Sequence, residues 1–348
     1  MKLAPVARAL ERQNGIEHIV VHTGQHYDTL MSETFFRDLG LARPEHELHV
    51  GSGTHGQQTA AILERVEKVC MELVPDWMLV YGDVNSTVAA ALAAVKLAIR
   101  VGHVEAGLRS HDRSMPEEHN RVVTDHLAEL LFTPSRDASE NLRAEGITDD
   151  RIAFVGNVMI DTLVCGLPHA RALAINERFG LQQEEYVLVT LHRPANVDDA
   201  TVLVTLMRAL EQIAKERPVI FPVHPRTMAR LRAAGFESAV GTLRVMEPLS
   251  YLQMLSLTDR AGVVITDSGG LQEETSFLGV PCVTVRPNTE RPLTVTKGTN
   301  RLVPPTYEAL VNAVLTAGRR RSPATIERWD GRAAERIANV LCTGAAID

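Results

Sequence analysis

The residues that could do chemistry stand directly after short apolar runs. Asp83 and Glu105 each follow such a run, and His192, His224 and Ser268 follow three others. A positioned carboxylate can accept or deliver a proton, and an imidazole can donate a hydrogen bond or carry a proton. If the runs are parallel strands, these residues gather at the edge of a sheet where ligands bind, so the pattern predicts a ligand site.

Residues 266–274, with the sequence TDSGGLQEE, carry the clearest local pattern. Ser268 can cap the helix that this stretch opens. Gly269 and Gly270 let an anion approach their N–H groups at the positive end of the helix dipole. Glu274 lies too far into the helix to cap it and would suit a sugar diol. We interpret the stretch as the phosphate-and-ribose end of a nucleotide site; a serine-capped helix after a tight turn is the alternative.

The other candidates have alternatives of the same kind. Glu117 and Glu118 stand in the first turn of a predicted helix, where acids also stabilise the helix dipole. Glu105 has a structural alternative as the ion-pair partner of Arg109. Arginine forks that suit phosphate follow three strand ends, at Arg193, Arg226 and Arg291.

Length and composition limit the class of protein. The 348 residues fit two domains better than one, and 45% hydrophobic with 23% charged residues is typical of soluble globular proteins. A net charge of −7 without a long basic run argues against nucleic acid as a partner; residues 319–321, all arginine, are interpreted as a solvated helix end. Four scattered cysteines predict reduced thiols in a cytoplasmic protein without a zinc site. We see no apolar run of roughly 18 residues that would span a membrane, and no signal peptide.

Strands and helices are predicted to alternate in two halves, with a boundary near residues 157–186. The expected strands are 19–23, 77–81, 100–104, 131–133, 152–155, 186–191, 219–223, 243–246, 262–266 and 282–285, and the main helices are 3–13, 57–73, 88–98, 116–131, 161–179, 201–215 and 332–341. An α/β domain of this kind normally begins with a central strand, which we expect upstream of Met1. The sequence has no nucleophile elbow, Walker A loop or HExxH helix.

Taken together, seven segments resemble the non-hydrolysing UDP-N-acetylglucosamine 2-epimerases. They keep the order found in that family and extend over nearly the whole chain. They are YGDVNST (81–87), GHVEAGLR (102–109), MPEEHNR (115–121), TLHR (190–193), PVHP (222–225), TDSGGLQEE (266–274) and TERP (289–292). The family's Gly-x-Arg-Pro turn has no counterpart, and only its lysine matches, at Lys2.

The resemblance implies an α/β fold of the GT-B type, with two Rossmann-like domains facing an interdomain cleft that holds a UDP-sugar. It implies an N-terminal domain at 1–158, a UDP-binding domain at 159–325, and a last helix within 326–348 that crosses back to the first domain. It implies no metal and no cofactor, and it suggests a homodimer.

The resemblance also assigns roles to residues. Ser268 with the Gly269 and Gly270 amides would hold phosphate, and Glu274 the ribose. The remaining substrate contacts would come from Lys2, Arg109, His192, His224, Arg226 and Arg291. The catalytic residues would be Asp83, Glu105, Glu117 and His192, with the assignment of base and acid left open.

The implied reaction is inversion at C2 of UDP-N-acetylglucosamine by anti elimination of UDP and its re-addition, in the supply of cell-surface polysaccharide precursors. An alternative is an epimerase of a UDP-2,3-diacetamido uronic acid, since relatives with that substrate share the loop style of residues 51–56 and 190–193. A GT-B glycosyltransferase and an inactive UDP-sugar-binding protein are the alternatives from other classes.

Overall fold

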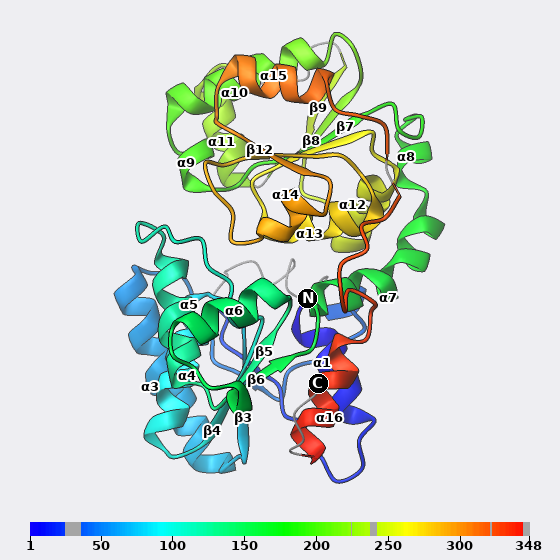
Figure 1. Cartoon of the computed structure of the whole chain (residues 1–348). Helices are drawn as coiled ribbons and strands as arrows, with labels where there is room; N and C mark the ends of the chain where they lie inside the picture. Colours follow the sequence, from blue (N-terminus) through cyan, green and yellow to red (C-terminus); the bar gives the residue numbers. More distant parts are fainter. Residues whose placement is uncertain (25–35, 224, 237–241, 321, 344–348) are drawn as a thin grey trace. The chain divides into compact units, whose positions relative to one another are not determined.

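The computed structural model describes residues 1–24, 36–223, 225–236, 242–320 and 322–343. The chain folds into two compact units (Figure 1). Met1–Thr162 and Glu327–Asp348 form the first unit, and Leu163–Ile326 forms the second. The first unit is therefore built from both ends of the chain.

Strands and helices alternate through the first unit, as the periodicity of the sequence predicts. Its described elements are α1 (Leu3–Glu11), β1 (Val21–His22), β2 (His46–Glu47), α3 (His55–Leu73), β3 (Trp77–Tyr81), α4 (Asn85–Lys96), β4 (Arg100–Val104), α5 (Pro116–Leu127), β5 (Leu130–Thr133), α6 (Arg136–Ala144), η1 (Asp149–Arg151), β6 (Ile152–Phe154) and α16 (Ala333–Thr343). Helix α7 (Val158–Leu173) begins in the first unit and ends in the second.

The main sheet of the first unit is parallel, in the order β3-β4-β5-β6, and β1 pairs with β2 in a separate parallel pair. The alanine-rich face of α4 packs with α3 over one side of this sheet in one hydrophobic cluster. Helices α1 and α16 lie side by side and belong to another, although they come from opposite ends of the chain (Figure 1). Asp161 fixes the start of α16, because its carboxylate accepts hydrogen bonds from the Ala333 and Ala334 amides at 3.1 and 2.7 Å.

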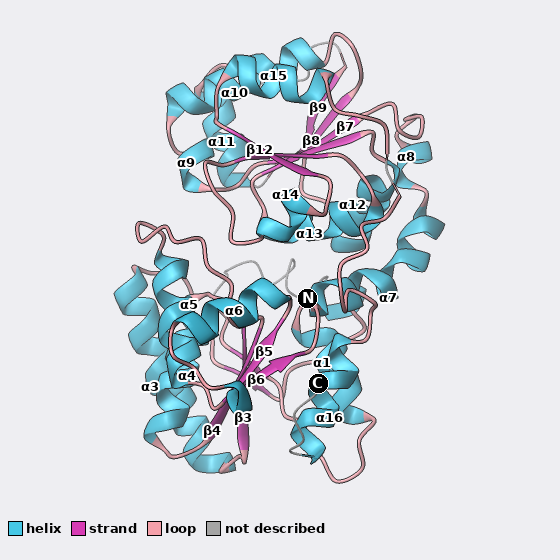
Figure 2. Cartoon of the chain, in the orientation of Figure 1, coloured by secondary structure: helices cyan, strands magenta, loops and turns pink. Residues whose placement is uncertain are grey.

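The second unit repeats the alternation with a larger sheet (Figure 2). Its elements are α8 (Ile175–Arg178), β7 (Val187–Thr190), α9 (Pro194–Val197), α10 (Ala200–Ile213), β8 (Val219–Pro222), α11 (Pro225–Ala233), β9 (Leu243–Met246), α12 (Tyr251–Arg260), β10 (Val263–Thr266), α13 (Gly269–Leu278), β11 (Cys282–Val285), α14 (Pro292–Thr296), β12 (Asn300–Val303) and α15 (Tyr307–Leu315).

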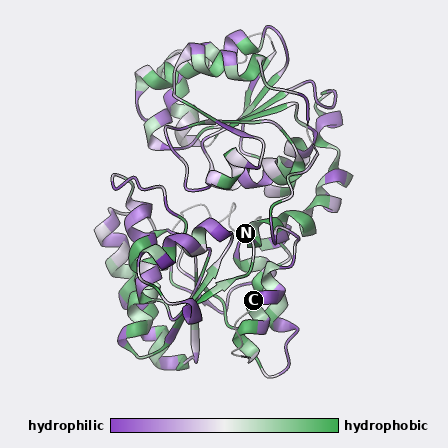
Figure 3. Cartoon of the chain, viewed as in Figure 1, coloured by the Kyte–Doolittle hydropathy of each residue, from purple (hydrophilic) through white to green (hydrophobic). Residues whose placement is uncertain are grey.

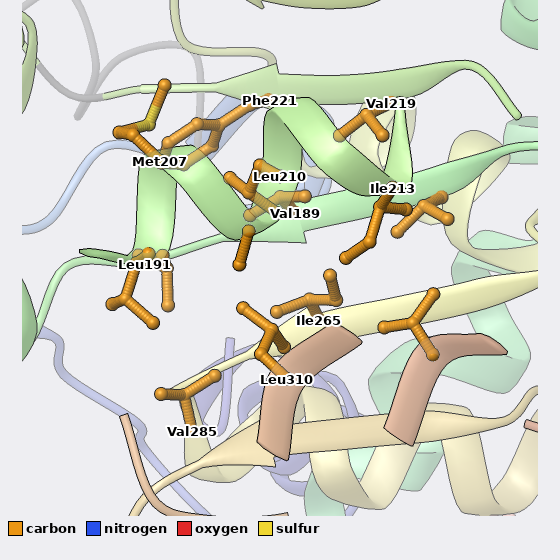
Figure 4. Close-up of a cluster of buried hydrophobic side chains, with 14 of the residues drawn as sticks. Val189, Leu191, Met207, Leu210, Ile213, Val219, Phe221, Ile265, Val285 and Leu310 are labelled. Atoms are coloured by element: carbon orange, nitrogen blue, oxygen red, sulfur yellow. The ribbon is translucent and has the colours of Figure 1, made fainter. Parts of the chain in front are cut away.

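The six strands described in the second unit are all parallel, in the order β9-β8-β7-β10-β11-β12. By sequence this is the order 3-2-1-4-5-6 of a doubly wound Rossmann sheet, whose connections reverse direction between β7 and β10. The strands are apolar along most of their length (Figure 3), as expected where helices cover both faces. On one face Leu210 and Ile213 of α10 and Leu310 of α15 pack against strand residues such as Val189 and Ile265 (Figure 4).

Two sequence-based expectations need correction. The helical stretch Val158–Arg178 has 21 residues and a mean hydropathy of 1.4 in its most apolar window, so by length and composition it could cross a membrane. Of that window, 44% is buried inside the protein, and core helices of soluble proteins can reach the same length and hydropathy. Arg320 is not a solvated helix end, because its guanidinium donates to the Leu278 carbonyl and contacts the Asp259 carboxylate at 3.2 Å.

Candidate active site

The second unit places polar residues at its topological switch point. Thr190 at the end of β7 and Thr266 at the end of β10 are register partners, and their hydroxyls lie 2.8 Å apart. The residues that follow the two strands, His192 and Asp267, therefore emerge next to each other. A crevice at this position is where doubly wound sheets bind their ligands.

Asp267, which the sequence analysis did not single out, organises this edge. Its side chain is fully buried and accepts hydrogen bonds from the His192 and Arg193 amides and from the Asn196 side chain at 2.9–3.1 Å. Burial alone would raise the pKa of Asp267, but His192 Nδ1 at 2.9 Å and these donors hold it below its usual range. His192 is thereby fixed on the protein side while 58% of its side chain stays exposed. The sequence signal for Asp267 was its place directly after an apolar strand.

The N-terminus of α13 lies beside this edge. Ser268 is the N-cap residue by position, but its side chain makes no capping hydrogen bond, so the expectation that it caps the helix is wrong. A side chain on Gly269 would overlap the Arg291 guanidinium and would approach Glu290 Oε1 to 2.7 Å. With glycine at this position, the Arg291 guanidinium can lie against the first turn of the helix without being displaced. Helix amides and a guanidinium at one point form a site for an anion such as phosphate.

Arg291 is held by a buried charge network that sequence reasoning did not predict. Its Nε lies 2.9 Å from Glu273, and its Nη1 contacts Glu290. Glu290 in turn lies 2.7 Å from Arg286, and all four side chains are at most 9% exposed. Glu290 also lies 3.9 Å from Arg193 Nη2, so two carboxylates hold three guanidinium groups, and the network fixes Arg291 in place.

Glu274 differs from these carboxylates because no cation accompanies it in the described interactions. It is buried, and its Oε1 accepts a hydrogen bond from Tyr251 at 3.3 Å. Burial raises the pKa of Glu274 to about 8; the Tyr251 hydrogen bond opposes this shift and the neighbouring Glu273 adds to it. An uncharged carboxyl at neutral pH can both donate to and accept from a hydroxyl group, so the position is suited to a diol.

The first unit places carboxylates at a strand edge too. Tyr81 and Val104 are register partners, so Gly82 and Glu105 leave β3 and β4 side by side. Glu105 is 5% exposed and adopts φ +73°, a left-handed conformation that is costly for a residue with a side chain. Its carboxylate contacts Lys2 Nζ, which passes so close to Gly82 that a side chain there would overlap it.

Asp83 is held by Arg121. The Arg121 Nε and Nη2 atoms lie 3.0 and 2.6 Å from the Asp83 carboxylate, and its Nη1 lies 2.6 Å from Glu118. Glu118 also accepts hydrogen bonds from Ser110 and the His111 amide; burial would raise the pKa of Glu118, but these donors and Arg121 keep it low. Glu118 is therefore structural.

Glu117, in contrast, is only half-buried, and no interaction of its carboxylate is found in the described part of the chain. Of the adjacent pair, Glu117 is the residue that can face a substrate.

Arg109 lies in a different environment from the one predicted. Its guanidinium is 2% exposed, pairs with Asp125 at 2.8 Å and with Glu145 at 2.7 Å, and does not pair with Glu105. Burial lowers the pKa of Arg109, but the two carboxylates more than compensate and keep it charged. These contacts make Arg109 a structural residue, and the prediction that it touches substrate finds no support in them.

Two predicted residues cannot be placed. His224 and the side chain of Arg226 lie outside the described residues. Within the residues that the structure does describe, no group of three or more His, Cys, Asp or Glu side chains could hold a metal ion.

Two Rossmann-like units, one with helix amides, a guanidinium and a buried carboxyl group near its switch point and one with carboxylates at its strand ends, define an α/β protein of the GT-B class. Comparison with protein families matches residues 8–342 to the family described as UDP-N-acetylglucosamine 2-epimerase. The chain belongs to this family.

Individual relatives agree with that assignment. The chain is 43% identical over 325 residues to the UDP-N-acetylglucosamine 2-epimerase of Methanococcus maripaludis, a match that covers 90% of this chain and 87% of the relative. It is 41% identical over 346 residues to the UDP-2,3-diacetamido-2,3-dideoxy-D-glucuronate 2-epimerase of Pseudomonas aeruginosa, with 98% and 96% covered. The crystal structure of the Methanocaldococcus jannaschii UDP-GlcNAc 2-epimerase in complex with UDP-GlcNAc and UDP matches with a TM-score of 0.90 and 42% identity, again with 98% and 96% covered.

Proposed function

We propose that this chain is an isomerase that interconverts UDP-N-acetylglucosamine and UDP-N-acetylmannosamine. The observation that carries the proposal is the 42% identity over 98% of the chain to an archaeal epimerase whose structure holds UDP-GlcNAc and UDP. The geometry of each unit supports it, because one presents anion donors and the other presents carboxylates.

In this proposal the second unit binds UDP. The Ser268 hydroxyl, the Gly269 and Gly270 amides and Arg291 contact the diphosphate, and Glu274 contacts the ribose diol. His192 serves as a further donor to the diphosphate and can carry a proton as UDP leaves. His224 and Arg226 remain predicted contacts that rest on the family resemblance.

The first unit supplies the proton transfers. A carboxylate removes the C2 proton, the electron pair forms a C1–C2 double bond, and the C1–O bond breaks with departure of UDP to give a 2-acetamidoglucal. In the return step a diphosphate oxygen attacks C1 and a proton is delivered to the opposite face of C2, so atoms and charge balance. Asp83, Glu105 and Glu117 are the candidate base and acid. Positive donors that face the departing diphosphate stabilise its charge.

The epimerase of a UDP-2,3-diacetamido uronic acid is the second candidate. The Pseudomonas aeruginosa relative with that name is 41% identical to this chain, as is the UDP-N-acetylglucosamine 2-epimerase of Methanocaldococcus jannaschii. A carboxylate at C6 and an acetamido group at C3 distinguish its substrate, so turnover of the two UDP-sugars discriminates the candidates.

The test is incubation of the purified chain with UDP-N-acetylglucosamine in D₂O, with the sugar C2 position followed by NMR. Deuterium at C2 together with a UDP-N-acetylmannosamine signal is the expected result. Saturable UDP binding without exchange or epimerisation would contradict the proposal, and the uronic acid substrate is then the next to supply.

We also propose a homodimer in the cytoplasm that serves the synthesis of polysaccharide precursors. The support is the family resemblance and four unpaired cysteines. Light scattering on the purified chain measures the oligomeric state directly.

A further inference from the structure

A histidine lies beneath the two turns that carry Asp83 and Glu105. His103 is in the middle of the sheet, on β4, and its side chain is fully buried. Its Nε2 lies 2.8 Å from the Gly82 carbonyl oxygen, and its Nδ1 lies 2.6 Å from Asp125 Oδ1.

The hydrogen-bond partners determine the protons on this ring. The Gly82 carbonyl can only accept, so Nε2 carries a hydrogen. Asp125 also accepts a hydrogen bond from the Gly107 amide at 3.1 Å and contacts Arg109 at 2.8 Å, and its Oδ1 holds the ring at Nδ1. The ring is therefore fixed at both nitrogens, with its Nε2 hydrogen directed at Gly82.

The bond to Gly82 orients the peptide that precedes Asp83. Gly82 has φ +68°, a conformation that glycine adopts readily, so its own backbone preference does little to fix this turn. A peptide group is planar, and fixing the Gly82 carbonyl therefore fixes the Asp83 N–H and the direction in which Asp83 leaves the sheet. On its other side, Asp125 holds the Gly107 amide two residues after Glu105.

We propose that His103 is a positioning residue. Its bond to the Gly82 carbonyl fixes the Gly82–Asp83 peptide and so holds the Asp83 carboxylate in its position relative to Glu105. The inference rests on the proposed function, because it assumes that both carboxylates act on the sugar. His103 itself is fully buried and does not touch substrate.

Two substitutions test the contributions of the two ring nitrogens separately. His103→Gln places an amide N–H near the position of Nε2 and can keep the bond to Gly82. His103→Asn places an amide N–H near the position of Nδ1 and can keep only the bond to Asp125. His169→Asn, at an exposed position on α7, is the matched control. For each variant kcat, KM, the Kd for UDP and the thermal midpoint are measured.

The expected result is a split between the two variants. His103→Asn should lower kcat about 10²-fold, the cost typical of a small misplacement of a reacting group, and leave the UDP Kd within about twofold. His103→Gln should stay within about tenfold of the wild-type kcat. Equal loss in both variants, or loss that follows the thermal midpoint, would overturn the proposal. Wild-type protein without epimerase turnover would instead contradict the proposed function.

The hydrogen bond to Gly82 has a readout that needs no activity. In protein labelled with ¹⁵N-histidine, the His103 ring should show a hydrogen on Nε2. A ring without a hydrogen on Nε2 would overturn the bond to Gly82 and with it the arrangement proposed here.

Discussion

Both units place charged residues at the carboxyl ends of their strands, but hydrogen-bond donors gather in one unit and acceptors in the other. In the second unit donors converge, since helix amides and Arg291 meet at Gly269 and the carboxylates behind them are buried and compensated. In the first unit acceptors converge, and Asp83 keeps 24% of its side chain exposed although Arg121 holds it. Position at a strand end therefore predicts a candidate site, while the partners of each group decide whether donors or acceptors converge there.

The largest effect should come from removal of a proton-transfer group. Glu117→Gln should lower kcat by about 10²–10⁴-fold, the usual contribution of a general acid or base. The UDP Kd and the thermal midpoint should not change, because the substitution breaks no interaction in the described structure. Glu129→Gln, an exposed position before β5, is the control. Loss of UDP binding with normal turnover of bound substrate would make Glu117 a binding residue and erase the contrast between the units.

Removal of the central cation of the second unit should affect both folding and binding. Arg291→Ala removes the guanidinium that contacts the buried carboxylates of Glu273 and Glu290, and breaking a buried pair in this way costs about 3–5 kcal/mol. Denaturant unfolding should show this loss, and calorimetry should show weaker UDP binding. Arg301→Ala, at an exposed position on β12, should change neither. Unchanged stability would mean that the two carboxylates become protonated or hydrated at little cost.

Loss of the diol contact should be smaller. Glu274→Ala should weaken UDP binding by about 1–3 kcal/mol, as expected for a lost buried hydrogen-bond partner. Titration of the variant with UDP checks this, and 2′,3′-dideoxy-UDP is the matching probe, because it should bind wild type and variant alike. Equal UDP affinity in both proteins would refute the ribose assignment.

The pH dependence of binding should show the charge state of Glu274. Its pKa of about 8 lies above the usual 4.5, so free protein holds a neutral carboxyl at pH 7. If ribose hydroxyls donate to the carboxylate, binding releases a proton, and UDP affinity should rise up to about tenfold per pH unit until pH 8 and then level off. With Glu274→Gln the diphosphate still titrates, but the rise in UDP affinity that comes from Glu274 should be absent.

The raised pKa of Glu274 also makes the free energy of unfolding depend on pH. The folded chain binds the Glu274 proton more tightly than the unfolded chain, so this contribution to stability is present below pH 4.5 and is lost as the pH rises to about 8. Unfolding free energies of wild type minus Glu274→Gln should therefore fall over that range. A difference that rises instead would contradict burial as the cause of the shift.

Much of the fold could be predicted from the sequence, because short apolar runs and turn residues are local signals. The strands at 77–81, 100–104, 243–246 and 282–285 are confirmed at the predicted bounds. The helix predicted at 116–131 is wrong at its end, since α5 stops at Leu127 and β5 begins at Leu130. Leu131 continues the apolar spacing of the helix, but its burial comes from pairing with β4 and β6.

The site was predicted less completely, because partners far apart in sequence decide each role. The sequence of two adjacent glutamates does not show which of them faces inward. The contacts of Glu118 with Arg121, Ser110 and the His111 amide identify it as structural. Arg109 had an apparent partner four residues away in Glu105, yet the fold pairs it with Asp125 and Glu145. These pairings form only when strands and helices assemble, so no local pattern contains them.

The side chains of His103, Asp125, Arg109 and Glu145 are joined by contacts of 2.6–2.8 Å. Replacing Arg109 alone removes the guanidinium that faces the fully buried Asp125, at a cost of about 3–5 kcal/mol, which is a large part of the stability of a typical domain. Replacing a cation and a carboxylate together avoids that penalty. The effect of a substitution at one of these four positions should therefore depend strongly on the residues at the other three. In evolution the four residues are expected to change together rather than one at a time.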